Sequence, residues 1–326
     1  MLYTTLGKTG LRVSRIGFGA WGIGGGAKDL KWADMWKADD EISKKSLLEA
    51  HSNGINFFDT ALEYGEGHSE RLISKALLGK DAVIATKVPP KDRHWPARNR
   101  NIEEVFPKNY IIENAMQSYE NLGRRTIDIL QLHVWMDEWI DDDGWREAFR
   151  FLREKGIARF FGVSVNDHEP DSAMKIVKSG EIDAIQVIYN IFDQSPRDKL
   201  FPLARKNGIG IIARVPLDEG SLGGTFTYDT AFNDWRKDYF TKPRLKETVD
   251  RVNAIKSKMV RPEMTMSQIA LKFCIVEGGA DIAIAGMRNP VHAKENAGSA
   301  EVSLTKEDLA FLYSQRWTRN FYPEDV

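Results

Sequence analysis

The chain alternates between short apolar runs and longer amphipathic segments along almost all of its 326 residues. Short runs rich in β-branched and aromatic residues predict strands buried on both faces, and apolar positions three and four residues apart predict helices between them. The predicted strands cover residues 15–18, 55–60, 82–87, 127–134, 160–165, 184–190, 210–217 and 281–287. The predicted helices cover residues 40–52, 69–78, 109–122, 144–154, 170–178, 196–206, 246–258, 267–276, 290–297 and 306–314.

This alternation predicts an α/β fold, a (β/α)8 TIM barrel. A helix after each strand requires crossovers between parallel strands, and eight such units close into a barrel. Residues 2–14 contain two β-prone runs around a turn bounded by glycines, which predicts an N-terminal β-hairpin cap. No linker or low-complexity tract interrupts the chain, so residues 1–326 are expected to form one domain. The long loops 89–107 and 218–243 follow strand ends and should lie on the catalytic rim.

Composition narrows the possible partners. Lys and Arg number 46 and Asp and Glu 47, so a net charge of -1 gives no general attraction to nucleic acid or to an anionic membrane. A small-molecule partner is therefore expected, and the oligomeric state stays open. The single cysteine, Cys274, cannot form an intramolecular disulfide, and charged residues interrupt residues 1–18 where a signal peptide would need an apolar core. We expect a cytoplasmic protein, without a membrane span or a metal site.

A glycine motif near the N-terminus suggests a different fold. The stretch from Gly17 to Gly22 matches G-x-G-x-x-G, with Asp39 or Asp40 as the acid that would bind a ribose. A dinucleotide-binding fold needs a helix that begins inside the glycines, but residues 23–31 carry three more glycines and no helical apolar stripe. Both acids also begin a predicted helix instead of ending a second strand. We therefore interpret the glycines as a wall of the barrel mouth.

Three predicted strand ends carry chemistry that belongs together: Asp59 followed by Tyr64, then Lys87, then His133. These ends converge in a barrel. A phenol titrates near pH ~10, and a neighbouring ammonium such as that of Lys87 lowers this pKa. Asp59 could hold the lysine, and His133 could donate a hydrogen bond to a carbonyl oxygen.

Each of these residues also has a structural interpretation. Asp59 could cap the next helix, Lys87 could extend to solvent, Tyr64 could pack in a loop, and His133 could be a core histidine. A barrel lyase that uses Lys87 as a Schiff base is another enzymatic interpretation. Their occurrence at successive strand ends favours a shared catalytic site.

Motifs along nearly the whole chain resemble the aldo-keto reductase superfamily, whose members are NAD(P)H-dependent carbonyl reductases built on the β/α barrel. The matching stretches are the leading hairpin, Gly19-Ala20-Trp21, Asn56-Phe57-Phe58-Asp59-Thr60-Ala61, Tyr64-Gly65, Gly67-His68-Ser69-Glu70, Thr86-Lys87, Gln131-Leu132-His133, Gly162-Val163-Ser164, Gln186-Val187-Ile188-Tyr189-Asn190 and Glu295-Asn296. The resemblance implies that Asp59, Tyr64, Lys87 and His133 form a catalytic tetrad, with Tyr64 as general acid.

The resemblance also implies contacts to the nicotinamide. Ser164 and Gln186 fall where the family binds the carboxamide. Asn166 would join them, although Val165 separates it from Ser164 where the family commonly has Ser-Asn. Arg214 occupies the position where many members place an aromatic ring against the nicotinamide. Its charge is expected to favour the reduced cofactor.

The last predicted strand ends in an anion site. Arg288 follows that strand, and Asn289 and Pro290 are typical of an N-cap and a first helical residue, whose free N–H groups attract anions. Arg288 with His292 or Lys294 would suit an adenosine 2′-phosphate. The cofactor-binding residues expected in all are Gly19, Ala20, Trp21, Ser164, Asn166, Gln186, Arg214, Val215, Leu217, Gly220, Ser221, Gly286, Met287, Arg288, His292, Glu295 and Asn296. Glu295 and Asn296 resemble the family's adenine contacts, and the glycine-rich residues 217–224 could lie along the pyrophosphate.

The expected function is reduction of aldehyde or ketone carbonyls to alcohols with NADPH, and possibly NADH, as cofactor. The alternative is a regulatory or redox-sensing protein of the same fold that binds the cofactor with little turnover. An aromatic substrate wall is a further hypothesis. The tryptophans that could form it are Trp32, Trp36, Trp95, Trp135 and Trp139.

Overall fold

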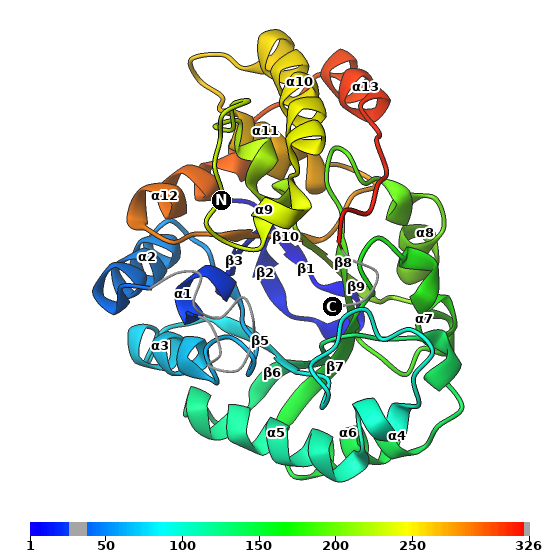
Figure 1. Ribbon diagram of the computed structural model, residues 1–326. Helices are drawn as coiled ribbons and strands as arrows, with labels where there is room; N and C mark the ends of the chain where they lie inside the picture. Colours follow the sequence, from blue (N-terminus) through cyan, green and yellow to red (C-terminus); the bar gives the residue numbers. More distant parts are fainter. Residues whose placement is uncertain (26–37, 323–326) are drawn as a thin grey trace.

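Eight parallel strands close into a barrel in the order β10-β3-β4-β5-β6-β7-β8-β9 (Figure 1). The computed structural model describes residues 1–25 and 38–322. The barrel strands are β3 (Ile16–Gly19), β4 (Phe57–Asp59), β5 (Val83–Val88), β6 (Ile127–Leu132), β7 (Ala158–Ser164), β8 (Ala184–Ile188), β9 (Gly210–Arg214) and β10 (Ile282–Gly286). The short run at residues 15–18 is thus a barrel strand, and the prediction of a (β/α)8 barrel is confirmed.

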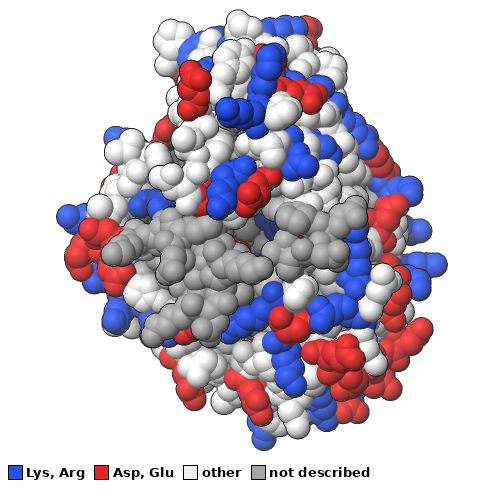
Figure 2. Space-filling model, in the orientation of Figure 1, with Lys and Arg blue, Asp and Glu red and all other residues white. Residues whose placement is uncertain are grey.

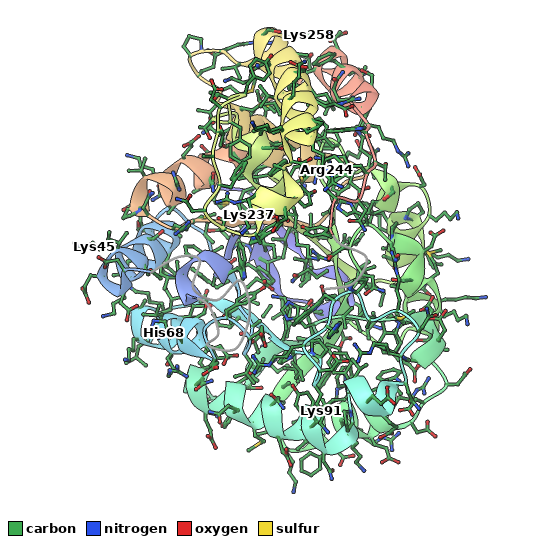
Figure 3. All side chains as sticks on the ribbon, in the orientation of Figure 1. Lys45, His68, Lys91, Lys237, Arg244 and Lys258 are labelled. Carbon is green, nitrogen blue, oxygen red and sulfur yellow. The ribbon has the colours of Figure 1, made fainter. Side chains whose placement is uncertain are left out.

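Helices surround this barrel (Figure 1). They are α1 (Trp21–Gly24), α2 (Asp40–Ser52), α3 (His68–Ala76), α4 (Ile102–Val105), α5 (Lys108–Leu122), α6 (Gly144–Glu154), α7 (Met174–Ser179), α8 (Leu200–Lys206), α9 (Arg236–Tyr239), α10 (Lys242–Met259), α11 (Met266–Cys274), α12 (Pro290–Gly298) and α13 (Lys306–Ser314). Charged side chains such as Lys45 of α2 and Lys258 of α10 point away from the barrel (Figure 3). None of the helices within the described ranges is long and apolar enough to cross a membrane.

The predicted hairpin is present and closes the N-terminal end of the barrel. Strands β1 (Tyr3–Thr5) and β2 (Arg12–Ser14) pair antiparallel. Leu6 and Val13 are fully buried against Phe57 and other side chains of the barrel interior. The hairpin therefore covers the end of the barrel opposite the carboxyl ends of the strands.

Several elements differ from the predicted ones at their ends. Strands β8 and β9 end at Ile188 and Arg214, before residues 190 and 217. After β8 the chain turns at Asn190, whose Oδ1 accepts hydrogen bonds from the N–H groups of Phe192 and Asp193. The helix predicted over residues 196–206 begins at Leu200, after a 3-10 turn. The helix predicted over residues 246–258 is longer and begins at Lys242. The two long loops contain α4, α9 and the 3-10 turn Asp218–Gly223.

The glycine motif contains a short helix that the sequence analysis did not predict. Helix α1 begins at Trp21, inside the glycines. The strand before it nevertheless pairs with β10 and β4 in the closed barrel, so the dinucleotide-binding fold remains excluded. Asp39 caps α2 by accepting hydrogen bonds from the N–H groups of Glu41 and Ile42.

Two of the five tryptophans proposed as a substrate wall pack elsewhere. Trp135 and Trp139 are buried and lie edge to face, with ring centroids 5.8 Å apart. Trp135 makes a similar contact of 5.3 Å with Trp145 of α6. Both belong to the buried core cluster, where Trp139 also contacts Phe106, so neither ring is available as a substrate wall. Trp32 and Trp36 lie outside the described residues.

The layer between barrel and helices can be tested on α6. Trp145 is 1 % exposed and Phe151, on the same helix, is 38 % exposed. Trp145→Ala should lower the free energy of unfolding by ~3–5 kcal/mol, since a large buried ring leaves a cavity. Phe151→Ala is the matched control and should change it by less than ~1 kcal/mol. Urea unfolding followed by circular dichroism measures both; equal effects would contradict this packing.

Candidate active site

All four predicted catalytic side chains lie together at the carboxyl ends of the barrel strands. Asp59 ends β4, and Lys87 lies in the next strand, β5. His133 directly follows β6, and its N–H donates to the carbonyl of Val88 at 3.0 Å. Tyr64 lies in the turn between β4 and α3. The closed barrel thus brings together residues that are far apart in the sequence.

The Lys87 ammonium is the centre of this cluster. Nζ is fully buried and donates to Asp59 Oδ1 at 2.5 Å, to the Thr60 carbonyl at 2.8 Å and to Tyr64 Oη at 3.3 Å. These three acceptors match its three N–H donors. Burial alone would lower the pKa of Lys87, but the Asp59 carboxylate and the Tyr64 hydroxyl raise it above its usual value. The lysine therefore stays charged at neutral pH.

Tyr64 retains its proton more firmly than its sequence context predicts. Burial raises the pKa of the phenol above 10, and the opposing effect of Lys87 is smaller. The expected lowering of this pKa was therefore wrong in its net direction, because a sequence does not reveal how deeply a phenol is buried. Tyr64 is a protonated phenol at neutral pH, in contact with an ammonium that can stabilise its anion.

The turn that carries Tyr64 packs against the glycine-rich segment. Gly65 has a φ of +65°, and a Cβ at this position would lie 2.0 Å from the carbonyl oxygen of Gly24. A Cβ on Gly24 would in turn lie 2.9 Å from the Tyr64 backbone. Only glycine permits this approach. Gly24, which follows the motif at residues 17–22, therefore lies against the Tyr64 turn. That the motif itself forms a wall of the barrel mouth stays a prediction.

His133 lies between two aromatic rings. Its ring centroid is 5.8 Å from that of Tyr64 and 5.5 Å from that of Trp95, both edge to face. Burial, followed by the positive charges of Lys87 and Arg214, lowers the pKa of His133 well below its usual value. The imidazole is therefore neutral at pH 7 and carries a single N–H. Its Nδ1 has no hydrogen-bond partner among the described residues.

Asp59 holds a second residue besides Lys87. Its Oδ2 accepts a hydrogen bond of 2.8 Å from Nε2 of Gln186, which lies opposite Ser164 in the β7–β8 pairing. Gln186 was expected to contact a nicotinamide, and a supporting role toward Asp59 was not foreseen. Its inward position on β8 was the available signal in the sequence.

Two other expected nicotinamide contacts are engaged within the protein. The Asn166 side chain accepts a hydrogen bond from the Ala97 N–H at 3.4 Å and donates one to Glu169 at 3.3 Å. Arg214 donates to the Val165 carbonyl at 2.9 Å and pairs with an Asp167 oxygen at 2.5 Å. Asn166 thus joins the loop after β5, and the charge of Arg214 is balanced by a carboxylate.

The predicted anion site has the expected backbone. Asn289 caps α12, and its side chain accepts from the His292 N–H at 3.0 Å, while Pro290 is the first helical residue. Arg288 is exposed. A Cβ added to Gly22 would lie 2.8 Å from Cγ of its side chain. Glycine at position 22 thus leaves room for the Arg288 side chain.

The remaining residues of this region lie on both sides of that helix end. Gly19 and Gly286 are paired in register at the ends of β3 and β10, and Met287 is buried behind them. Glu295 accepts a hydrogen bond of 2.7 Å from the Thr265 hydroxyl. Asn296 donates to the Gly286 carbonyl at 3.5 Å.

The glycine-rich loop after β9 is fastened by the C-terminal tail. Arg319 donates to Asp218 at 2.6 Å, and both side chains are buried. Ser221 donates to the same carboxylate at 2.5 Å, and Tyr322 donates to Glu219. Burial raises the pKa of Glu219 to about 7. The contacts of Arg319 and Tyr322 with this loop were not foreseen, because no local pattern in the sequence links the tail to it.

Other residues expected to bind cofactor border this loop. Val215 has a φ of +51°, and Leu217 directly precedes the 3-10 turn, in which Gly220 has a φ of +96°. Ala20 directly follows β3. The ring of the next residue, Trp21, lies edge to face against that of Trp235 in the loop after β9, with 6.5 Å between the ring centroids.

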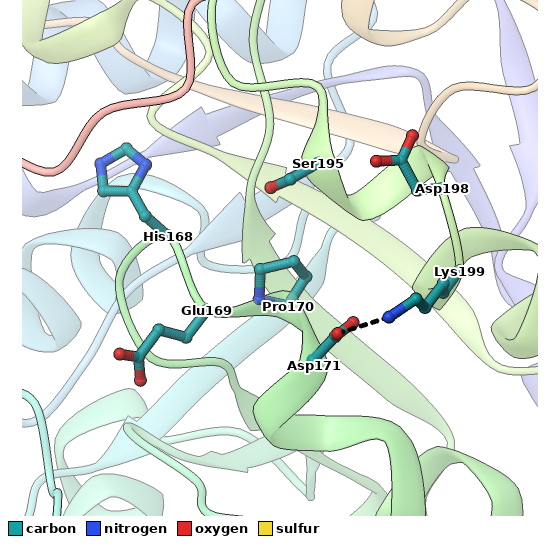
Figure 4. A pocket seen from close by; sticks show the side chains of 7 residues that line it. All are labelled: His168, Glu169, Pro170, Asp171, Ser195, Asp198 and Lys199. Carbon is teal, nitrogen blue, oxygen red and sulfur yellow. Dashed lines mark hydrogen bonds and ion pairs between the residues drawn. The ribbon is translucent and has the colours of Figure 1, made fainter.

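A separate surface depression of about 460 Å³ lies outside the tetrad (Figure 4). Lys199 pairs with Asp171 at 2.8 Å across it. The residues that line it are His168, Glu169, Pro170, Asp171, Ser195, Asp198 and Lys199. On the face that Figure 2 presents, acidic and basic side chains are interspersed, in keeping with the small net charge.

Comparison with known proteins places these features in context. The sequence profile of the family described as Aldo/keto reductase family matches residues 15–314. "Aldo-keto reductase YhdN" of Bacillus subtilis (strain 168) is 30% identical over 318 residues, covering 94% of this chain and 91% of the relative. "NADH-specific methylglyoxal reductase" of Escherichia coli (strain K12) is 28% identical over 320 residues, covering 94% and 96%. The solved structure of aldo-keto reductase AKR11C1 from Bacillus halodurans, in its holo form, superposes with a TM-score of 0.74 at 25% identity, covering 97% and 96%.

The buried Lys87 and Asp59 pair leads to a stability prediction. Lys87→Met should lower the free energy of unfolding by ~3–5 kcal/mol, because it leaves the Asp59 carboxylate buried without its cation. The double variant Lys87→Met with Asp59→Asn should recover part of this loss, since no buried charge then remains. Thermal or urea unfolding of the three proteins provides the measurement. A double variant less stable than Lys87→Met alone would contradict the pairing.

Proposed function

The chain belongs to the aldo-keto reductase family of oxidoreductases, whose members use a nicotinamide cofactor, and from this premise we propose that it reduces aldehyde or ketone carbonyls to alcohols with NADPH. The observation that carries the proposal is the contact of the Lys87 ammonium with both Asp59 and Tyr64. A phenol beside a buried ammonium is suited to give up a proton to an oxygen that develops negative charge.

Each member of the tetrad then has a distinct role. Tyr64 keeps its proton at neutral pH and donates it to the carbonyl oxygen as that oxygen gains charge. Lys87 stabilises the phenolate that is left, and Asp59 holds the lysine in place. His133, which is neutral, offers its single N–H to orient the carbonyl. Bound NADPH supplies the hydride.

The residues at the mouth fit a nicotinamide cofactor in two places. Ser164 ends β7, and Gln186 keeps its side-chain carbonyl for a carboxamide while its amide group holds Asp59. Arg288 lies beside the capped N-terminus of α12 and would bind an adenosine 2′-phosphate. Asn166 is left out of this proposal because both ends of its amide are engaged. Because Asp167 balances Arg214, a strong preference for the reduced cofactor is no longer expected.

We further propose that the protein acts as a single cytoplasmic domain on small carbonyl compounds. The tetrad favours turnover over a purely regulatory role. The three N–H donors of Lys87 are directed at Asp59 and Tyr64, which the proposed reduction requires, and at Thr60 in the turn that carries Tyr64. The Schiff-base interpretation loses support for the same reason, since a charged, fully paired amine is a poor nucleophile.

Removal of the Tyr64 hydroxyl tests its role as proton donor. Tyr64→Phe should lower kcat/KM for carbonyl reduction by ~10²–10⁴-fold and leave the Kd for NADPH unchanged, because the proposed role of the hydroxyl is to protonate the reacting oxygen and not to bind the cofactor. NADPH absorbance and cofactor fluorescence measure the two quantities. Tyr228→Phe, at an exposed tyrosine, is the control and should retain full activity. Substantial turnover by Tyr64→Phe would refute the assignment.

Cofactor choice depends on Arg288. Arg288→Gln should weaken NADPH binding by ~10-fold or more and change NADH binding little, since a charged hydrogen bond to phosphate contributes ~1.5–3 kcal/mol. Fluorescence titration of both cofactors provides the measurement, with Lys306→Gln on α13 as control. Equal affinity of the unmodified protein for the two cofactors would contradict the proposed preference.

A further inference from the structure

Residues 93–98, in the loop after β5, form a strap across the barrel mouth that is held at both ends. At one end Arg93 Nη1 donates to Glu63 Oε1 at 3.1 Å. At the other end the Ala97 N–H donates to Asn166 at 3.4 Å. The strap therefore connects the turn after β4 to the segment after β7.

Two further contacts strengthen its far end. Arg98 pairs with Glu169, and Glu169 also accepts a hydrogen bond from Asn166. Between the two fastenings the strap places Trp95 edge to face against His133, with 5.5 Å between ring centroids. His133 makes the same kind of contact with Tyr64. Trp95 therefore lies against the imidazole that contacts the proton donor.

Glu63, which holds one end of the strap, is unusually buried for a carboxyl group. It immediately precedes Tyr64 and is 3 % exposed, although it carries a carboxyl group. Its Oε2 is buried and has no hydrogen-bond partner within the described part of the chain. Arg93, in contrast, is partly exposed on the outer side of the pair. The strap therefore covers a carboxyl group that would otherwise face water.

We propose that Glu63 is a positioning residue that fastens residues 93–98 through Arg93 and so sets the place of Trp95 against His133 and Tyr64. Glu63 does not touch the substrate. It acts on substrate binding through the strap, and Trp95 favours carbonyl compounds with an apolar or aromatic group next to the carbonyl. Only the catalytic part of this inference rests on the proposed reduction.

The charges around Glu63 make the fastening depend on pH. Arg93 faces it from the strap loop, Glu66 from its own turn, and Tyr110 from α5. Burial raises the pKa of Glu63 to about 7, and the nearby Arg93 only partly opposes this. If the strap opens, water reaches the carboxyl group and its pKa returns toward ~4.3. Glu63 therefore binds its proton more tightly when the strap is closed. As pH rises through 7 this proton is lost, and the free energy needed to open the strap falls.

Hydrogen exchange of the full chain, read by mass spectrometry, tests the fastening without any substrate. After correction for intrinsic rates, protection of the amides of residues 93–95, 97 and 98 should fall by about tenfold between pH 6 and pH 8.5. Glu63→Gln keeps the size and one hydrogen-bond acceptor for Arg93 but cannot ionise. It should hold the strap at both pH values. Glu63→Ala should lose protection at both.

Arg93→Met removes the same contact by changing its more exposed partner. It can replace Glu63→Ala if that variant does not fold. It should also reduce protection of residues 93–98, whereas Lys246→Gln on α10 should not. In steady-state kinetics, Glu63→Ala or Arg93→Met should raise the KM for the carbonyl substrate by ~3–10-fold, with kcat and the Kd for NADPH nearly unchanged.

Two results would overturn the inference. One is unchanged protection of residues 93–98 in both Glu63→Ala and Arg93→Met. The other is a Glu63→Gln variant that keeps the pH dependence of the unmodified chain. A protein that reduces no carbonyl compound but shows the predicted exchange would refute the proposed reaction and leave the fastening intact.

Discussion

The buried ammonium of Lys87 is the constraint on which the rest of the site depends. A charge in the interior of a barrel is costly unless it is paired and hydrogen-bonded. Here a carboxylate, a backbone carbonyl and a phenol satisfy its three donors. Each acceptor comes from β4 or from the turn after it, so the geometry of that turn is fixed by the need to satisfy one cation in β5.

The surrounding structure serves this requirement. The hairpin seals the opposite end of the barrel with apolar side chains, and Gly24 and Gly65 allow the Tyr64 turn to approach α1 closely. Gln186 satisfies the second oxygen of Asp59. Burial also explains the charge states, since it keeps Tyr64 protonated and His133 neutral at pH 7. Proton donation and carbonyl orientation are thereby assigned to different side chains.

The sequence predicted those features that depend on local pattern or on strand ends. The eight strands, the Asn289 cap and the convergence of Asp59, Lys87 and His133 follow from periodicity and from the geometry of a barrel. The direction of the Tyr64 pKa did not follow, because burial depends on packing. The contacts of Asn166 and of Arg319 were also missed, since each joins segments whose loops have no fixed geometry in the sequence.

The central claim is that Tyr64, not a histidine, supplies the proton. The most direct test is the pH dependence of the single-turnover rate with NADPH and a saturating concentration of a carbonyl substrate, followed by cofactor absorbance. Because the pKa of the Tyr64 phenol is raised above 10, the rate should stay level from pH 6 to about pH 9. A rate that falls as pH rises through 6 to 7 would identify an imidazolium as the donor and contradict this account.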